Sequence, residues 1–407
     1  MTRLTCGFVA ALLVLAGVTP AMAQSGRPDP KAEPWTGSRL QLGPLFFNPT
    51  FQLRNIGIDD NVFNDADFPR QDLTGTLAMD SIIGVRARAL IVTLTQATSY
   101  TWYRRYRSER SVDGGLKVVS ELRLTNLRPW FVWERAESHE RGGFEIDARA
   151  GRETPNWSTG ADFTFGRLGL SAGFSRTRLR YAEGESFEDV DLKVALDHRS
   201  EQLGGAVRYA LSDTLSLDAT ADWAKERYDF SPIRDKDTMS YSLALSSSSE
   251  ASVQLSARAG WKDQQFNDPA TEGFRGVVGN GSVSFLPSEW MRLTLEGSRD
   301  VGVSFETEFP YYLQQGGRVE ALVRFSEFFD LTFRGEGQWL KYTKDQTGIE
   351  LPRQDRTAVL GAEFGYYLGG ESGTRIGLRY EYAERVSPIA RRNYARNRVY
   401  SDFRLRF

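Results

Sequence analysis

The sequence has almost no cysteine and few long apolar segments. Cys6 is the one cysteine among 407 residues, so a disulfide scaffold within the chain is excluded. A helical multi-span membrane protein needs several apolar runs of about 18 residues or more, and a mean hydropathy of −0.43 leaves little room for them. Aromatic residues make up 12% of the chain, which is too high for a disordered protein. The class that is left is a large, ordered protein whose composition is polar on average.

The net charge is close to zero, and histidine is rare. The 51 Lys and Arg residues nearly balance the 53 Asp and Glu residues, so no global field attracts nucleic acid, and we expect no such partner. The two histidines, His139 and His198, have polar sequence neighbours, but adjacent strand residues point to opposite faces, so neither forms a local catalytic dyad. The sequence also lacks a phosphate-binding loop, a zinc-spaced ligand set and a dinucleotide fingerprint. We therefore expect no enzyme activity, no cofactor and no metal site.

The first residues have the pattern of a secretory signal peptide. Arg3 precedes a short apolar core from Phe8 to Val18, and Ala21-Met22-Ala23 supplies a cleavage site. A membrane anchor is the alternative, but the apolar run is shorter than the roughly 20 residues that a spanning helix needs. We expect a cleaved signal peptide at residues 1–23 and a proline-containing periplasmic linker at 24–44.

From residue 45 to residue 407 the dominant signal is alternation of apolar and polar residues. In the segment Leu215–Trp223, every second residue is apolar and the residues between are Ser, Asp or Thr. The segments 253–261 and 375–382 repeat the pattern. These runs are about nine residues long, which is the length that a bilayer demands of a tilted strand.

Short turn signals alternate with longer polar loops along the same region. The turns recur about every forty residues, for example at Gly166-Arg167, Ser212-Asp213 and Pro287-Ser288, and loops such as 229–237 and 345–356 lie between them. Tight periplasmic turns and long external loops are typical of outer-membrane barrels. The pattern predicts an all-β, antiparallel, up-and-down transmembrane barrel of about 18 strands, with 16 as the alternative. A propeller shares the period, but the sequence lacks a blade signature; an array of β-sandwiches is the other alternative.

Aromatic residues lie where the two membrane interfaces are expected. Trp223, Trp261 and Trp339 end strands that lead into long loops, whereas Trp290 and Phe328 lie beside short turns. The last strand ends on a row that includes Phe403, Leu405 and Phe407. This row resembles the C-terminal signature that the barrel assembly machinery reads, so we expect that machinery as a partner.

If the apolar rows face lipid, the alternate rows face the interior of the barrel. Those rows interleave arginine with carboxylates, and an interior this charged needs water or ion pairing, because a charge in a dry core costs several kcal/mol. The pattern leaves open whether the arginines form structural ion pairs or a solute-selective ladder. The predicted interior residues are Asp218, Asp222, Arg258, Arg292, Glu296, Arg324, Arg334, Glu336, Glu363, Arg375, Arg379 and Glu381.

A motif at the end of the first predicted strand resembles a known family. Asp59, Asp60, Asn61, Val62 and Phe63 follow Gly57-Ile58, and the likeness extends to 298–312 and to the C-terminus. On these residues the chain resembles the β-barrel porin 2 family, members of which accompany exopolysaccharide and capsule export systems. The resemblance implies an outer-membrane barrel of about 16 to 18 strands with a role in polysaccharide export, and polysaccharide export proteins as partners.

The acidic residues of this motif, together with Asp65 and Asp67, have two interpretations. Their oxygens suit Ca²⁺, or their side chains cap backbone groups in a tight loop.

Two functions follow from the sequence. The first is a porin-like outer-membrane channel that passes saccharides or supports exopolysaccharide export. The second is a structural or adhesive barrel whose loops bind surface glycan or lipopolysaccharide, with Arg391, Arg392, Arg396 and Arg398 as the expected contact. Both place the chain in the outer membrane, in contact with its lipid and lipopolysaccharide.

Overall fold

The computed structural model describes Arg27, Pro28, Glu33, Trp35, Ser38 and residues 40–248, 252–342, 353–369 and 374–406. The predicted signal peptide, most of the predicted linker and Phe407 lie outside these residues. In the part of the chain that is described, no helix is long and apolar enough to cross a membrane.

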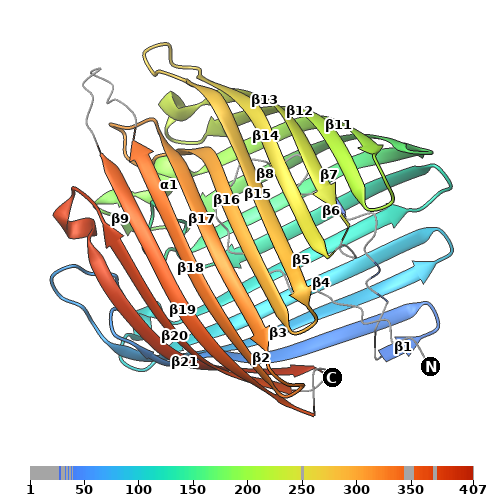
Figure 1. The fold of residues 1–407 in the computed structure, drawn as a ribbon. Helices are drawn as coiled ribbons and strands as arrows, with labels where there is room; N and C mark the ends of the chain where they lie inside the picture. Colours follow the sequence, from blue (N-terminus) through green and yellow to red (C-terminus); the bar gives the residue numbers. More distant parts are fainter. Residues whose placement is uncertain are drawn as a thin grey trace.

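Long antiparallel strands form nearly the whole structure (Figure 1). They are β2 (Leu45–Asp59), β3 (Asp72–Ala87), β4 (Leu90–Tyr103), β5 (Ser111–Leu122), β6 (Leu127–Ser138), β7 (Arg152–Phe165), β8 (Leu168–Tyr181), β11 (His198–Ala210), β12 (Leu215–Tyr228), β13 (Lys236–Ser247), β14 (Val253–Phe266), β15 (Phe274–Ser288), β16 (Met291–Val303), β17 (Tyr311–Arg324), β18 (Phe329–Tyr342), β19 (Gln354–Leu368), β20 (Thr374–Val386) and β21 (Tyr394–Arg406).

The structure also contains short secondary-structure elements. They are β1 (Leu40–Leu42), which pairs with the start of β2, the two-residue strands β9 (Ser186–Phe187) and β10 (Val190–Asp191), the helix α1 (Leu192–Leu196) and the 3₁₀ turns Arg107–Glu109, Pro232–Arg234 and Ala390–Arg392.

The sheet closes on itself. Each long strand pairs with its neighbours in sequence, and β2 pairs with both β3 and the last strand, β21. Figure 1 shows the seam where the red β21 lies beside the blue β2. The prediction of a closed barrel of 18 antiparallel strands is confirmed.

Connections alternate in length, as predicted. Two-residue turns at 88–89 and 166–167 lie at one end of the barrel, and loops such as 139–151 and 182–197 lie at the other. One predicted turn is displaced: Pro287 and Ser288 belong to β15, and the turn follows at 289–290.

The strands are longer than predicted. They contain 12 to 16 residues, against about nine expected from the alternation. The extra residues lie mostly at the long-loop end, where outward-facing side chains such as Arg178 are charged and the apolar alternation no longer marks the strand.

One face of the sheet is apolar and exposed. Leu217, Tyr241, Leu295 and Leu360 stand on this face and are among the exposed large apolar residues. Trp223, Trp261, Trp290, Trp339 and Phe328 are also exposed, which fits the predicted girdles. A surface of this size and composition requires lipid around it.

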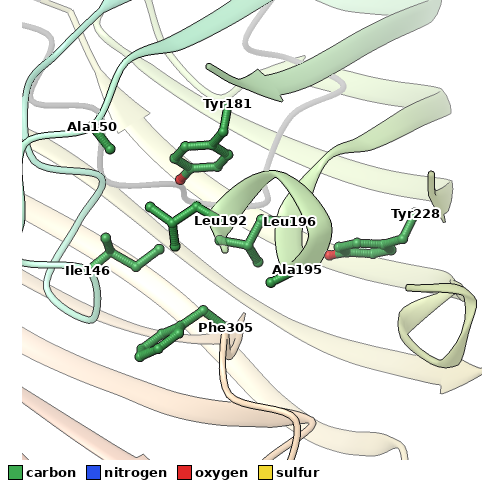
Figure 2. Packing of buried hydrophobic residues seen from close by; sticks show 8 residues of the cluster. All are labelled: Ile146, Ala150, Tyr181, Leu192, Ala195, Leu196, Tyr228 and Phe305. Atoms are coloured by element: carbon green, nitrogen blue, oxygen red, sulfur yellow. The ribbon is translucent and has the colours of Figure 1, made fainter. Parts of the chain in front are cut away.

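The main buried apolar cluster lies between loops rather than within the sheet. Figure 2 shows Leu192, Ala195 and Leu196 of α1 between Tyr181 and Tyr228. Ile146 from loop 139–151 and Phe305 from loop 304–310 complete the cluster. The long-loop end is thus a packed structure.

Candidate functional site

The twelve predicted interior residues all lie on the sheet face opposite the exposed apolar side chains. In β12, Asp218 and Asp222 alternate with the exposed Leu217 and Trp223, and in β19 Glu363 lies next to the exposed Phe364. The same alternation places the other nine, because successive strand residues point to opposite faces.

Three of the twelve, Glu363, Arg375 and Arg379, contribute to a ladder of ion pairs across β18, β19 and β20. Arg375 donates to Asp330, with Nη2 2.7 Å from Oδ1 and Nε 3.1 Å from Oδ2, and its other nitrogen binds Glu363. Arg379 donates to the second oxygen of Glu363 from Nε at 2.6 Å. Arg324 lies opposite Asp330 in the β17–β18 ladder.

The ladder continues to β21. Arg379 Nη1 lies 3.2 Å from the hydroxyl oxygen of Tyr400, and the Arg398 guanidinium carbon lies 4.7 Å from the centroid of the Tyr400 ring. Arg334 and Arg398 both bind Glu381, at 2.7 and 3.4 Å. The structure therefore brings several predicted residues into one connected network.

The other predicted residues are more dispersed. Asp218 accepts from Arg208 Nε at 2.6 Å, on the far side of the barrel from the ladder. Glu296 and Glu336 flank Arg318 from the two neighbouring strands. The remaining three residues, Asp222, Arg258 and Arg292, stand on β12, β14 and β16 at separate positions on the same face of the sheet.

Loops cross the barrel at its long-loop end. An antiparallel bridge between Arg141 and Arg149 folds loop 139–151 back on itself. Its Glu145 accepts from Ser304 Oγ at 2.6 Å and from the backbone N–H of Phe305 at 3.2 Å. Because β6 and β7 lie far from β16 and β17 in the ring, this contact spans the mouth of the barrel.

Buried arginines fix the crossing loop. Arg392 and Arg385 donate to the backbone oxygen of Glu145, and Arg234 Nη2 lies 2.8 Å from the backbone oxygen of Phe305. These three arginines are 2 to 4% exposed. Buried guanidinium groups need several partners each, so the loops that supply those partners are held together.

A carboxylate pair completes this mouth network. Asp355 accepts from Arg385 at 2.5 Å and from Ser387 Oγ at 2.6 Å, and it lies 3.2 Å from Arg392. Glu306 binds Arg353 at 2.6 Å, and the Arg353 guanidinium stacks over the ring of Tyr342. Removal of one partner from such a network leaves an uncompensated buried charge.

Glu145 has unusual electrostatics within this network. Burial raises the pKa of its carboxyl to about 7, although the hydrogen bonds from Ser304 and Phe305 favour the ionised form. Burial also raises the pKa of Glu188, opposed by Arg391. Sequence reasoning missed Glu145 because loop residues carry no periodic signal, and it missed Asp355 and Arg385, at the long-loop ends of β19 and β20, because the apolar alternation no longer marks the strands there.

The family-like motif closes the seam between the first and last strands. Asp59 accepts from Arg396 Nε at 2.9 and 3.1 Å, and Asp60 accepts from the Asn397 backbone N–H at 2.7 Å. Asn61 donates to the backbone oxygen of Ala395 at 3.1 Å.

The acidic side chains of the motif cap backbone groups. Asp59 accepts from the Asn61 N–H at 3.1 Å, and Asp65 accepts from the N–H groups of Asp67 and Phe68 at 3.0 and 3.1 Å. These bonds support the capping interpretation over Ca²⁺ coordination. Within the described residues, no group of three or more His, Cys, Asp or Glu side chains is arranged to hold a metal ion.

The arginine cluster at the C-terminal end is not the exposed patch that we expected. Arg392 is 4% exposed and is bound in the mouth network, Arg396 binds Asp59, and Arg398 binds Asp59 and Glu381. Only Arg391 of the four has a side chain that is mostly exposed, at 60%. The other three arginines are not exposed because they form ion pairs with carboxylates of other strands and loops that are far away in sequence.

The two histidines have structural contacts. His139 Nδ1 lies 2.9 Å from Asp113 Oδ1, and His198 Nδ1 lies 2.7 Å from the Leu196 carbonyl oxygen and stacks on Tyr228. Among the described residues, no serine hydroxyl completes a triad with either ring.

The described residues of the predicted linker contact the barrel wall. Arg27 lies 2.9 Å from Asp162, Pro28 accepts from Arg128 at 3.0 Å, and the ring of Trp35 lies under the guanidinium of Arg86. These contacts lie near the short-turn end, because Arg128 and Asp162 adjoin the turns there.

Comparison with known proteins agrees with this architecture. The model of the family described as "Putative beta-barrel porin 2" matches residues 40–407. The chain belongs to this family. It is therefore a porin-like outer-membrane β-barrel channel, and its family and fold indicate a channel rather than an enzyme.

Solved outer-membrane porins share the fold of this porin. Pseudomonas aeruginosa OccK2 (OpdF) is 13% identical with a TM-score of 0.53, and the match covers 89% of this chain and 98% of OccK2. Acinetobacter baumannii OccAB3 is 9% identical with a TM-score of 0.50, covering 89% and 99%. At these identities the likeness shows the fold alone. No curated protein sequence matches the porin.

Proposed function

We propose that the barrel passes saccharides, or supports the export of an exopolysaccharide, and that the twelve residues named above line its lumen. The observation that carries the proposal is the ladder of Asp330, Arg375, Glu363, Arg379 and Tyr400. Carboxylates accept hydrogen bonds, guanidinium groups donate them and a phenol does both. Such a chain of groups suits the hydroxyls and carboxylates of a sugar.

An acidic saccharide is the first solute class to test. OccK2 from Pseudomonas aeruginosa has also been solved in complex with glucuronate; that structure is 13% identical to this chain with a TM-score of 0.51. Planar guanidinium groups bind carboxylates in a bidentate manner, and Arg375 and Arg379 supply two of them in the ladder.

The mouth network favours a second candidate, a structural or adhesive barrel whose loops bind surface glycan or lipopolysaccharide. Glu145, Asp355 and their arginines hold loops from opposite sides of the barrel together, which narrows any path for a solute. In either case we also propose a cleaved signal peptide, recognition of Phe403, Leu405 and Phe407 by the barrel assembly machinery, and polysaccharide export proteins as partners.

Conductance of the refolded protein in a planar bilayer separates the two candidates. A channel gives discrete current steps that glucuronate oligomers reduce in a concentration-dependent way. Arg375→Gln should weaken this block, whereas Arg275→Gln, on the outward face of β15, should leave it unchanged. Absence of current above background would favour the structural barrel, and block by neutral sugars alone would exclude the acidic class.

A further inference from the structure

A basic surface lies on the outward face of β8 and β11, two of the four neighbouring strands β7, β8, β11 and β12. Arg176, Arg178 and Arg180 alternate along β8, and Arg199 of β11 pairs directly with Arg178. We call these four residues the outer arginine cluster. They lie toward the long-loop end, which is the extracellular end in barrels of this kind.

The cluster has unused hydrogen-bonding capacity. Arg176 and Arg199 share one oxygen of Glu201, each at 3.6 Å, and Arg180 lies 3.8 Å from Glu153. These separations are too long for hydrogen bonds, and none of these three arginines donates one to another described residue. Their side chains are 43 to 45% exposed. Only Arg178 has a close partner, Asp229 at 2.7 Å.

The cluster stands at the edge of the apolar band. Trp157 pairs with Arg176 across the β7–β8 ladder and packs against Phe174 with the ring centroids 5.3 Å apart. From Trp157 to Phe165, the exposed apolar row of β7 rises only about 20 Å at a rise of ~3.3 Å per residue and a tilt of ~40°. Arg178 stands two residues beyond Arg176 on β8, about 25 Å above Phe165, which is the height of the apolar band of a barrel, so the cluster reaches the depth of lipid headgroups.

A hollow lies on the same four strands, on the membrane side of the cluster. Small residues form its floor, namely Ala161, Ala172, Gly205 and Ala221, and they pair in one row across the strands. Phe163, Leu170 and Val207 border it, and its volume is about 630 Å³. Sites for small ligands fall in the range of about 300 to 1,000 Å³. An apolar hollow in a lipid-facing wall accepts hydrocarbon.

We propose that this surface binds a phosphorylated glycolipid of the outer leaflet, with a phosphate on the outer arginine cluster and an acyl chain in the hollow. Guanidinium forks match phosphate geometry, and the free donors of Arg176, Arg180 and Arg199 provide it. Because the charge and the hollow both lie on β8 and β11, the surface suits one amphiphilic ligand rather than a free anion. The site is separate from the ladder, so it does not depend on what passes through the barrel.

The test uses the refolded mature protein in detergent, and measures the temperature at which the folded band disappears from an unboiled gel. Diphosphorylated lipid A should raise that temperature, while dephosphorylated lipid A and inorganic phosphate should not. Arg176→Gln combined with Arg199→Gln should abolish the rise. Ala172→Leu combined with Ala221→Leu, which fills the hollow and keeps the charge, should reduce it.

Arg275→Gln is the matched control. Arg275 is also an exposed outward arginine at the long-loop end, bound to Asp263 at 2.8 Å, but it lies on β15. This variant should keep the full response to lipid A. An equal loss in Arg275→Gln, an equal rise with inorganic phosphate, or an unchanged rise in the double arginine variant would each overturn the proposal. A folded band without lipid establishes that each variant has folded.

Discussion

Glu145 makes the packing of the mouth depend on pH. Its pKa is raised to about 7 by burial, above the ordinary 4.5, so the folded state binds the proton more tightly than the unfolded state. The resulting stabilisation is complete below pH 4.5 and is lost as the pH rises through 7. Its size is on the order of 3 kcal/mol. Hydrogen-exchange protection of residues 139–151 and of Phe305 should therefore be greater at about pH 5 than at about pH 8.

A glutamine in place of Glu145 mimics the neutral carboxyl. Glu145→Gln should keep high protection at both pH values, whereas Glu140→Gln, at an exposed position of the same loop, should retain the wild-type pH dependence. Equal protection of the wild type at the two pH values would contradict the role assigned to Glu145.

Asp59 stabilises the seam of the barrel. It is 1% exposed and accepts from Arg396 through both carboxylate oxygens. Loss of one partner of a buried ion pair costs about 3 kcal/mol, so Asp59→Ala should lower the free energy of unfolding in urea by about that amount. Asp65→Ala, which removes only exposed caps in the same loop, should cost about 1 kcal/mol or less. Similar losses of unfolding free energy in both variants would contradict the stabilising role assigned to the pair of Asp59 and Arg396.

At the scale of elements, strands were predictable and loops were not. The alternation in 215–223 and the turn signal at Gly166-Arg167 are local, and each is confirmed as part of a strand or turn. The end of β15 was misplaced because Pro287 looked like a turn residue, although its strand continues to Ser288. Contacts such as Glu145 with Ser304 join residues far apart in sequence, and no local pattern encodes such pairings.

The same distinction applies to the candidate site. Alternation alone placed Arg375 and Glu363 on one face, because a strand side chain has two choices of face. It could not show that Arg375 bridges Asp330 and Glu363, or that Arg396 binds Asp59, because the register of the strands decides both contacts.

Loop 139–151 is the element that most directly controls the mouth. It contacts Ser304 and Phe305 on the opposite side, and Asp147 ties it to Asn64 beside the seam at 2.7 Å. Replacement of the loop by a two-residue turn should increase the single-channel conductance in a planar bilayer, because the strands that form the wall remain paired. Loop 267–273, for which no cross-barrel contact of this kind occurs among the described residues, provides the matched deletion. An equal increase in both deletions would argue against a constriction at loop 139–151.

The whole molecule inverts the arrangement of a soluble protein. Apolar side chains such as Leu295 and Leu360 lie on the outside, and the main apolar core lies among loops at one end. The mean hydropathy of −0.43 is thus an average over a lipid-facing surface and a charged one. Polar composition alone would have suggested a soluble protein, and only the two-residue period distinguishes the two cases.

The balance of charge on the proposed lumen wall determines the ion selectivity of the channel. Six of the twelve proposed lumen residues are arginines and six are carboxylates, and the ladder pairs several of them closely. Paired charges of opposite sign largely cancel at the distance of a hydrated ion. The reversal potential under a KCl gradient should therefore lie near zero. Arg375→Gln should shift it toward cation selectivity, because Asp330 loses its closest partner, and Asp330→Asn should shift it the opposite way. Strong anion selectivity of the wild type would mean that arginines outside this set dominate the conducting path.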